Sequence, residues 1–467
     1  MTKPVKRLSL IGAVLLVAGC ARFDPRPLSP ATNADRLESR SLTNAALRAF
    51  VEQNLHKPFP DWPAKEWDLE ALSWAAFYYH PSLELARAQW AVARGGEVTA
   101  SQHPNPVITV SPSYNTTTLT PSPWLAIATL DVPIETAGKR GHRRRQAASM
   151  AEAARLNIAA TAYKVRSDVR TALVDVIGAE ARNTLIQEQL QVQQEIVRRL
   201  EQQAQAGAVS PSDSLLMRLA LDKARLDSAN AQRLATEARS RLAESLGVPL
   251  EALQGVDLRF DLNAAAAPED LTSSVIRRLA LLSRPDILTA LAEYHATESA
   301  LRLEIARQYP DVHLQPGYEF DQGDNKWGLG FSVELPVLSQ NQGPIAEARA
   351  RREESAAKFN VLQAKVLAEI DRAIDLFRTT EKNSTLLRAL AETADRRQQT
   401  AEAQFKSGAI DQTEVLNARL EAVSARLIRL DGQAKLQQAL GALENAVQRP
   451  LEFPRELFQP TGNHAAR

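Results

Sequence analysis

Residues 312–337 read VHLQPGYEFDQGDNKWGLGFSVELPV, and hydrophobic and polar side chains alternate along most of this stretch. The hydrophobic set comprises Val312, Leu314, Pro316, Tyr318, Phe320, Trp327, Leu329, Phe331, Val333, Leu335 and Val337. The intervening positions hold polar residues or glycine, namely His313, Gln315, Gly317, Glu319, Lys326, Gly328, Gly330, Ser332 and Glu334. This alternation predicts two β-strands with unlike faces, and DQGDN at 321–325 predicts the turn between them.

A less regular copy of this pattern lies earlier in the chain. Its alternating positions are Ile108, Val110, Pro112, Tyr114, Trp124, Ala126, Ala128, Leu130 and Val132. Strands of roughly ten residues, with one apolar face and aromatic residues near their ends, have the dimensions of strands in an outer-membrane β-barrel. The alternative is a soluble hairpin packed on helices.

Four landmarks from the first half of the chain return in the same order about two hundred residues later. The pairs are His80-Pro81 with Arg284-Pro285, Gln102-His103-Pro104 with Gln308-Tyr309-Pro310, 130–134 with 333–337, and Gly207-Ala208-Val209 with Gly408-Ala409-Ile410. A near-constant offset indicates one structural unit used twice. We expect repeat 1 at 67–259 and repeat 2 at 271–450, each with a helix, a strand pair and a long helical hairpin, joined by a linker at 260–270.

Each repeat contains a stretch that predicts an unusually long helix. Neither glycine nor proline occurs between Ile345 and Ser407, which at 1.5 Å per residue allows a helix of roughly 95 Å. In the first copy, alternating steps of four and three residues trace a coiled-coil seam. The seam comprises Val165, Val169, Ala172, Val176, Ala179, Asn183, Ile186, Leu190, Gln193, Val197, Leu200 and Ala204. We expect the helices to break at the two glycine landmarks and to resume at about Pro211 and Asp411, which gives two helical hairpins.

The beginning of the chain predicts export and lipid anchoring. Three basic residues precede an apolar stretch at 8–18, the pattern of a signal peptide at 1–19. The chain has one cysteine, Cys20, directly after LVAG, and this sequence resembles the bacterial lipoprotein processing signal. The resemblance implies that Cys20 carries the lipid, and Ala21 in place of aspartate resembles lipoproteins that are sent on to the outer membrane.

Two further segments lie outside the repeats. We expect 20–66 to be a lipid-anchored, extended N-terminal segment in which the part from Ala21 to Pro63 has no regular structure. Residues 451–467 are expected to form a C-terminal tail. No stretch after residue 19 is long and apolar enough for a transmembrane helix.

The composition excludes several classes of function. The formal net charge is +1, and removal of the signal peptide leaves the chain close to neutral, which argues against a nucleic-acid partner. The seven histidines lack the spacing of metal ligands, so we expect no metal site and no cofactor. We find no glycine-rich phosphate loop and no nucleophile–base arrangement, so we do not expect an enzyme.

Four strands cannot close a barrel, and a membrane does not tolerate an open sheet edge, because unpaired backbone groups find no water there. The chain is therefore expected to associate with itself. Barrels of about eight strands are filled by side chains, whereas larger barrels leave a lumen. Three chains would supply twelve strands and a duct.

From about Trp67 to Pro450, the chain resembles the TolC-like outer-membrane efflux family. The resemblance lies in the two X-Pro helix starts, the paired strands and the tip sequences AGAV (206–209) and SGAI (407–410). The resemblance implies a mainly α fold with membrane β-strands: a long α-helical coiled-coil barrel in the periplasm, and four β-strands per chain that join a trimeric 12-stranded outer-membrane barrel. It also implies a lipoprotein outlet that passively conducts small molecules or metal ions. The implied partners are a homotrimer, outer-membrane lipid, a periplasmic adaptor and an inner-membrane pump of the RND type.

Two finer points follow from the same resemblance. The hairpin tips would contact the adaptor through Gly207, Ala208, Val209, Gly408, Ala409 and Ile410. PIE at 133–135 with GKR at 138–140 resembles the outlets of heavy-metal resistance pumps, the CzcC-like branch, although the second repeat has SQNQ at 339–342 instead.

Candidate gate residues lie just after the tips. Glu414 and Asn417 fall at positions that resemble the residues lining the family's periplasmic constriction, which are usually acidic. Threefold symmetry would turn Glu414 into a ring of three carboxylates, whereas Asn417 departs from the acidic pattern. Asp213 lies at the equivalent distance from Gly207. For Glu414 and Asp213 the alternative is a surface or helix-capping carboxylate.

The clearest run of basic residues covers 139–145, where the second strand passes into the long helix. Cations near a helix N-terminus are disfavoured by the helix dipole, so an anionic neighbour such as lipid phosphate would offset them. A solvated basic stretch is the equal alternative. His313, on the polar strand face, is expected to line the lumen rather than to bind metal.

Rival interpretations belong to other classes of protein. A periplasmic adaptor would show one helical hairpin flanked by small β-domains, which the doubled strand pair argues against. A structural periplasmic coiled-coil lipoprotein would not need outward-facing residues such as Trp327 and Phe331. A type I protein-secretion outlet also stays open, and the exported substrate is not identified by the sequence.

Overall fold

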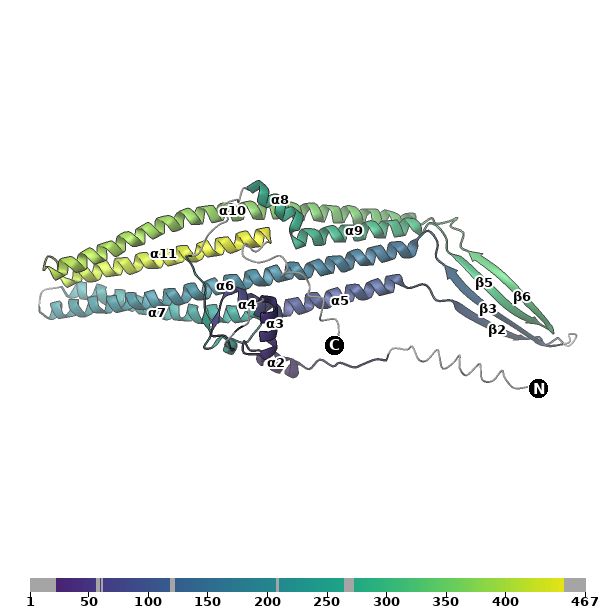
Figure 1. Ribbon diagram of the computed structural model, residues 1–467, viewed down its shortest axis with the longest axis horizontal. Coiled ribbons are helices and arrows are strands. Elements are labelled where there is room, and N and C mark those ends of the chain that lie inside the picture. The colour runs from purple at the N-terminus through teal and green to yellow at the C-terminus, as the bar shows by residue number, and fades with distance from the viewer. Residues whose placement is uncertain are drawn as a thin grey trace.

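The computed structural model describes residues 22–55, 59, 62–117, 122–206, 210–263 and 273–448. These residues form an elongated molecule with the four long strands at one end and the ends of two helical hairpins at the other (Figure 1). Shorter helices lie beside the middle of the long ones. No helix among these residues is both long and apolar enough to span a membrane.

The same order of elements occurs twice along the chain. The first set comprises α4 (Leu69–Tyr79), α5 (Pro81–Ser101), β2 (Val107–Tyr114), β3 (Trp124–Ile134), α6 (Lys139–Gln205) and α7 (Pro211–Leu246). The second comprises α8 (Ser273–Ser283), α9 (Pro285–Ala306), β5 (Val312–Asp321), β6 (Asp324–Val333), α10 (Gln342–Lys406) and α11 (Gln412–Val447). Smaller elements are α2 (Pro30–Glu38), α3 (Ala45–Leu55), β1 (Glu66–Trp67), η1 (Leu250–Leu253) and β4 (Asp257–Leu258).

The repeated X-Pro landmarks mark helix starts. His80 and Arg284 are the N-cap residues of α5 and α9, with extended backbone angles and proline at the first helical position. Proline suits this position because its fixed φ fits the helix and its missing N–H has no partner to lose. The His80 ring Nδ1 also accepts a hydrogen bond from the Ser82 N–H at 3.2 Å.

The long strands and the helices that follow them form one continuous layer. The sheet order is β2-β3-β5-β6, and every neighbouring pair is antiparallel. On the strand side of the molecule the helices pack in the matching order α5, α6, α9 and α10. Each strand therefore continues into a helix at the same place in the layer, and β2 and β6 are edge strands that no other described residue pairs with on their outer side.

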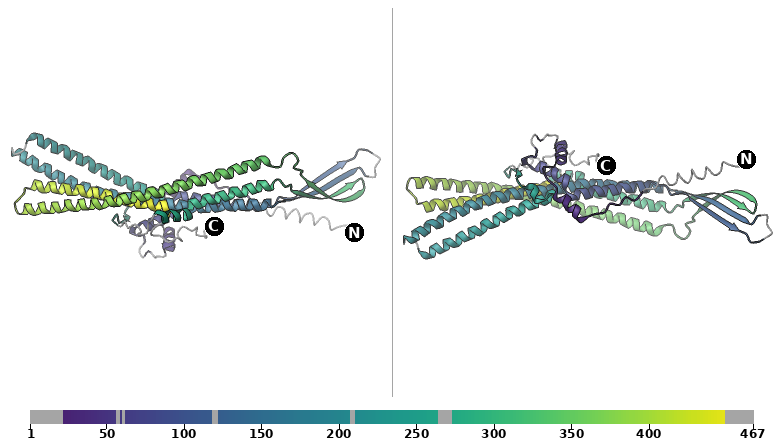
Figure 2. Two further views of the ribbon diagram at one scale, coloured as in Figure 1. Left: turned by 90° about the horizontal axis from the view of Figure 1, so that it is seen from above. Right: turned by 90° about the horizontal axis from the view of Figure 1, so that it is seen from below.

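On the tip side the neighbouring helices are α7, α6, α11 and α10, and they form the hairpins α6–α7 and α10–α11. The two hairpins are seen as separate pairs in the views from above and below (Figure 2). The predicted seam of α6 is confirmed, since all of its positions are buried or partly buried. Gly178 lies on the same helix, where an added Cβ would be 3.6 Å from the Ala434 Cβ, so α6 and α11 approach closely.

The strand hairpin of the second set has a two-residue turn. Gln322 and Gly323 both have positive φ, at 51° and 122°, between the paired residues Asp321 and Asp324. The prediction that the following strand continues to Val337 is wrong, because β6 ends at Val333. Val333 pairs with Val312, the first residue of β5, so later residues have no partner strand.

The N-terminal segment also differs from its prediction. The expectation that Ala21 to Pro63 lacks regular structure is wrong over α2 and α3. The segment is held against the long helices by Arg40, whose guanidinium donates to the Tyr79 carbonyl at 2.7 Å and to the Gly247 carbonyl at 2.8 Å. These carbonyls lie at the C-terminal ends of α4 and α7, where the last carbonyl groups of a helix have no N–H donor within the helix.

The largest group of buried apolar side chains lies in the middle of the molecule. It joins the N-terminal segment, α4, α6 and α7 through residues such as Trp67, Leu72, Leu173 and Leu242, all at most 1% exposed. A second group joins α8, α10 and α11. Full burial of one large apolar side chain contributes about 1.5–3 kcal/mol, so these two groups stabilise the packing of the helices in the middle of the molecule.

Candidate functional site

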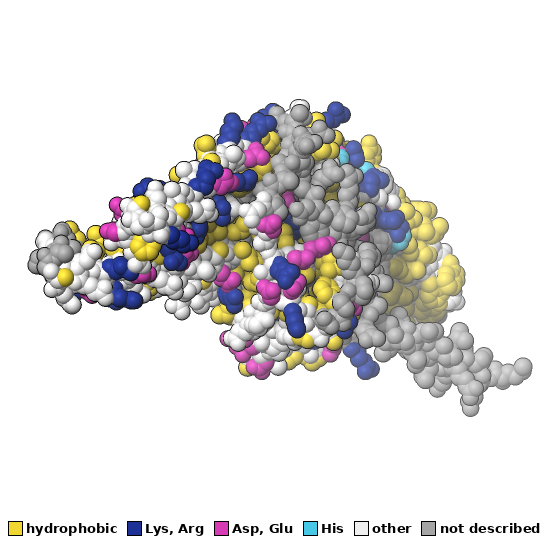
Figure 3. Space-filling view, turned by 60° about the vertical axis from the view of Figure 1, so that its left-hand side comes forward, with side chains coloured by type: hydrophobic (Ala, Val, Ile, Leu, Met, Phe, Trp, Pro, Cys, Tyr) yellow, Lys and Arg dark blue, Asp and Glu magenta, His cyan; other side chains and the backbone are white. Residues whose placement is uncertain are grey.

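The sheet has two chemically different faces, as the alternation predicts. Cross-strand pairs on one face are apolar, among them Tyr114 with Trp124 and Tyr318 with Trp327, whose ring centroids lie 5.1 and 4.9 Å apart. Trp327 is 82% exposed in the single chain. Hydrophobic side chains gather at the strand end of the molecule, whereas charges of both signs are scattered over the helices (Figure 3).

The opposite face is polar and is organised around a histidine–aspartate pair. The His313 ring Nδ1 of β5 lies 3.0 and 3.1 Å from the two carboxylate oxygens of Asp131 in β3. Gln315 donates to the same carboxylate from its amide nitrogen at 3.4 Å. His313 therefore lies on the polar face, as predicted.

The junction between strands and helices contains several ion pairs. Lys139, the first residue of α6, lies 2.8 Å from the Asp311 carboxylate, which also accepts from the Thr136 N–H at 2.8 Å. Burial alone would raise the pKa of Asp311, but the hydrogen bonds from Lys139 and Thr136 outweigh it and hold this pKa below its usual value. The junction is therefore fixed by charge-assisted bonds between the two repeats.

Some of the basic residues at 139–145 already have partners within the chain. Lys139 has Asp311 as its anionic neighbour, and Arg143 has the Glu135 carboxylate, so the chain itself supplies part of the offsetting charge. Arg140 donates to the Ser101 carbonyl at 2.7 Å. Arg144 is exposed. Lipid binding by this run stays a prediction, and it rests on the exposed arginines alone.

Polar side chains link α6 to α11 along most of their shared length. The links are Glu195 with Gln412, Glu188 with Arg419 and Arg426, Arg182 with Asp431, and Asp175 with Gln438. Beside the first two of these lies a small apolar group of Val192, Ile196 and Leu416. The two hairpins of one chain are thus joined edge to edge through α6 and α11.

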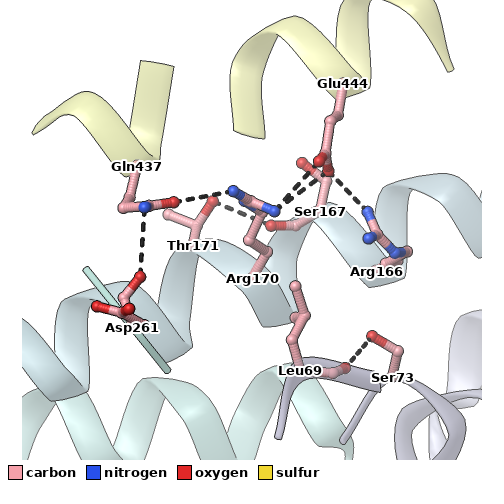
Figure 4. Close-up of polar contacts among 9 residues, drawn as sticks. All are labelled: Leu69, Ser73, Arg166, Ser167, Arg170, Thr171, Asp261, Gln437 and Glu444. Atoms are coloured by element: carbon pink, nitrogen blue, oxygen red, sulfur yellow. Dashed lines mark hydrogen bonds and ion pairs between the residues drawn. The ribbon is translucent and has the colours of Figure 1, made fainter. Parts of the chain in front are cut away.

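A buried polar cluster lies at the inner end of this row of links (Figure 4). Arg166 and Arg170 of α6 both contact the Glu444 carboxylate of α11, at 2.9 and 3.2 Å. Arg170 also donates to Gln437 at 3.1 Å, and Gln437 donates to the Leu262 carbonyl at 3.2 Å. The four charged and amide side chains are at most 5% exposed, so the cluster ties both repeats to the segment that connects them.

This cluster is not among the sequence-based predictions, although the sequence contains a signal for it. Arg166 and Arg170 each directly follow a residue of the coiled-coil seam and are four residues apart, so they share one face of α6. Glu444 and Gln437 are seven residues apart on α11 and also share a face. Charged residues beside a seam at these spacings indicate a paired polar layer, but the partner helix is not specified by spacing.

The hairpin end between α10 and α11 lies wholly within the described residues. Gly408 has φ of 77°, and the Ala409 N–H donates to the Gln404 carbonyl at 2.9 Å, which closes α10. Asp411 caps α11, since its carboxylate accepts from the Glu414 N–H at 2.9 Å. The Glu414 side chain is exposed and so is Asn417, three residues further along the helix. Both can therefore face an open space at this end of the molecule.

Some predicted residues lie outside the described part of the chain. These are Cys20 with the signal peptide, the tip residues Gly207, Ala208 and Val209, and the tail at 451–467. The Asp213 side chain is also outside it. Among the residues described, no group of three or more histidine, cysteine, aspartate or glutamate side chains could hold a metal ion.

This architecture of strands, long helices and hairpins is matched by known proteins. The sequence pattern of the outer membrane efflux protein family matches residues 76–248 and 276–447, which are most of both repeated sets. The chain belongs to this family. The TolC-like resemblance is thereby confirmed.

Individual relatives are distant in sequence and similar in length. The cobalt-zinc-cadmium resistance protein CzcC of Cupriavidus metallidurans is 24% identical over 412 residues, which are 84% of this chain and 92% of that protein. The solved outer-membrane channel OprN superimposes with a TM-score of 0.70 at 17% identity, over 94% of this chain and all of that one. The solved structure of CusC gives 0.66 at 18% identity, over 82% and 92%. The family fold therefore extends over nearly the whole chain.

Proposed function

We propose that this chain is one of three identical subunits of an exit duct in the outer membrane. In this assembly, strands β2, β3, β5 and β6 contribute one third of a 12-stranded barrel and the long helices contribute one third of a periplasmic tunnel. The observation that carries the proposal is the layer with strand order β2-β3-β5-β6 and helix order α5, α6, α9, α10, open at both edges.

The open edges support association with further copies. β2 and β6 each present unpaired backbone groups, and their apolar face has to meet lipid for the exposed Trp327 and Phe331 to be covered. Pairing of β6 with the β2 of the next copy satisfies both requirements. Twelve strands leave a lumen, whereas eight would be filled by side chains.

The helices carry matching apolar surfaces at the same two edges. On α7 the exposed residues Leu219 and Leu226 lie about 8 and 15 residues from the helix start at the tip. On α10 the exposed Leu386 and Leu390 lie about 20 and 16 residues from the helix end at the tip. Leu226 and Leu390 are therefore at a similar height, so that α7 of one copy can pack against α10 of the next.

The remaining parts of the assembly are proposed from the family. The hairpin tips at 207–209 and 408–410 would contact a periplasmic adaptor, which passes the cargo on from an inner-membrane pump of the RND type. Cys20 would carry the lipid anchor. Glu414, with Asn417 and Asp213, would form the periplasmic gate. The cargo would be small molecules or metal ions, and the relative named for cobalt, zinc and cadmium resistance favours cations.

The test is native mass spectrometry of the protein extracted from outer membranes in detergent, followed by planar-bilayer recording. We expect a mass of three chains, each carrying a lipid, and stepwise ion currents. Cys20→Ser is the matched control, since it should remove the lipid mass and leave the trimer and its currents. A monomer that stays in solution without detergent would refute the duct and favour a coiled-coil spacer lipoprotein. Transport of an unfolded polypeptide would instead support a type I secretion outlet.

A further inference from the structure

The pair formed by Asp131 and His313 lies where the sheet meets the helices. Asp131 is three residues from the end of β3, and His313 is the second residue of β5. Both lie on the polar face of the sheet, opposite the face that carries the tryptophans. In the proposed duct this is the inner mouth of the barrel, which all cargo must cross after leaving the helical part.

The four strands carry an unbalanced set of charges. Their acidic residues are Asp131, Glu319, Asp321 and Asp324, and Lys326 is their one lysine or arginine. Lys326 lies at the far end of the sheet, where its ammonium is 2.5 Å from Asp321 and its backbone pairs with Glu319. Lys326 offsets only part of the charge of Glu319, Asp321 and Asp324, so the far end stays acidic, and Asp131 is the one acidic strand residue at the near end.

The two lysines nearest in sequence to these strands lie far from Asp131 or are already engaged. Gln315 pairs with Gly330, four residues along β6 from Lys326, which places Lys326 about 13 Å away along the strand. Lys139 is engaged by Asp311. The register partners that surround the pair are uncharged, since Asp131 faces Val107 of β2 and His313 faces Pro133 of β3 and Ser332 of β6.

The carboxylate is held in place by its two polar neighbours. Because Asp131 accepts from His313 Nδ1 and from the Gln315 amide, it is oriented by neighbours on β5. Between this level and the far end, the polar face has small residues, Gly317, Gly328 and Thr129. A fixed charge with little bulk beside it acts on passing ions through its field, not by blocking the passage.

We propose that Asp131, oriented by His313 and Gln315, is a specificity-determining residue that makes the inner mouth of the barrel prefer cations over anions. The inference rests on the proposed trimeric duct, in which three copies of Asp131 form a ring of carboxylates. It deepens that function by assigning a cargo class, positively charged ions or molecules, to a place distant from the tip residues. His313 and Gln315 are positioning residues.

The test is the reversal potential of single channels in a KCl gradient, for the full-length protein reconstituted from outer membranes. Wild type is expected to prefer K⁺ over Cl⁻. Asp131→Asn is expected to lower this permeability ratio about threefold near 0.1 M salt, and much less near 1 M, where the screening length falls from about 10 to 3 Å. His313→Gln keeps the carboxylate and should retain the preference. Gln315→Glu adds a second charge and should strengthen it.

Asp257→Asn is the matched control, because Asp257 is an exposed carboxylate of the small β1–β4 sheet beside the long helices. Its channels should keep the wild-type ratio. Channels of Asp131→Asn and Gln315→Glu that both keep that ratio would overturn the inference and leave the duct intact. If Asp131→Asn does not assemble, the permeability ratio of Gln315→Glu alone tests the inference, and an unchanged ratio would overturn it. A wild-type trimer without ion currents would refute the proposed function itself.

Discussion

The guanidinium of Arg170 in α6 lies 3.2 Å from the carboxylate of Glu444 in α11, and both side chains are buried. These residues belong to different repeats and are 274 positions apart in the chain. Arg166 shares the same carboxylate, so one acidic group balances two guanidinium groups. The contact is therefore a point where the two repeats depend on each other.

Glu444→Gln is expected to destabilise the protein strongly. The change removes the carboxylate from two buried arginines, and breaking a buried ion pair on one side typically costs about 3–5 kcal/mol. Thermal unfolding in detergent, followed by circular dichroism, measures the effect. Asp431→Asn is the matched control, because its ion pair with Arg182 joins the same two helices while both side chains are more than 40% exposed. That change should cost less than about 1 kcal/mol. Equal shifts in the two variants would contradict a special role of the buried cluster.

The His80 side chain is expected to make the free energy of unfolding depend on pH. Burial lowers the pKa of His80 below its ordinary value of 6.5, so the folded state favours the neutral ring. The neutral ring is also required to accept from the Ser82 N–H, because a protonated ring has no acceptor. Stability from this group is thus present above pH 6.5 and is lost as the pH falls through the lower folded pKa. We expect a loss of about 1 kcal/mol, the usual contribution of a helix cap.

His80→Asn separates this contribution from other titrating groups. Asparagine caps helices well and does not titrate, so the variant should keep the stability of α5 without the acid-induced loss. The pKa of the nearby Asp168 is raised by burial, and this carboxylate interacts electrostatically with His80, so the substitution removes that interaction together with the titrating ring. Melting temperatures of the two proteins between pH 5 and 8 should converge at high pH and diverge at low pH. Parallel curves would exclude His80 as the source.

The features that could be predicted from sequence are those with a local period. Alternation around Trp327 predicts the strands and their faces, and the absence of glycine and proline before Ser407 predicts α10. Both features belong to one continuous stretch of sequence, so they can be recognised without knowing which segment the element packs against. The over-long prediction for β6 has the same origin, because alternation continues to Val337 although the partner strand does not.

The features that were missed depend on contacts between distant segments. β1 and β4 pair over two residues each, Glu66 with Asp257 and Trp67 with Leu258, and two residues are too few to show a period. Arg166 and Glu444 are separated by 278 positions, and no local pattern specifies their meeting. For α2, however, the sequence did hold a signal, since Ser29 caps the helix and Pro30 begins it.

The two faces of β6 predict opposite effects of adding a charge. Leu329 lies on the apolar face and Gly328 on the polar face, at neighbouring positions in the middle of the strand. Leu329→Arg should impair membrane assembly, because an arginine facing lipid costs about 2–4 kcal/mol near the midplane. Gly328→Arg should assemble, since a Cβ added there meets no atom within 4 Å and the arginine would lie on the polar face. The yield of heat-resistant oligomer from outer membranes measures both, and the reverse order would show that the faces are assigned the wrong way round.

The basic run at the start of α6 offers a matched pair of charge reversals. Arg143→Glu would place a second carboxylate beside that of Glu135, so the junction should be weakened and oligomer yield should fall. Arg144→Glu removes an exposed charge that no described residue pairs with. A lower yield or weaker binding to vesicles with anionic lipid would support a headgroup contact for Arg144. Wild-type behaviour of Arg144→Glu would leave a solvated surface charge as the interpretation.

Glu414 offers the test of the gate. Its carboxylate is exposed in the first turn of α11, and threefold symmetry would bring three such groups around the axis of the duct. Glu414→Ala is therefore expected to raise single-channel conductance or to weaken cation preference in planar bilayers. Glu421→Gln is the control, because it lies two turns further along the same helix and its carboxylate is 2.7 Å from Arg397. Since that charge is already paired, its removal should leave the conductance unchanged. Recordings of Glu414→Ala that match wild type would remove the gate assignment and make this carboxylate a surface residue.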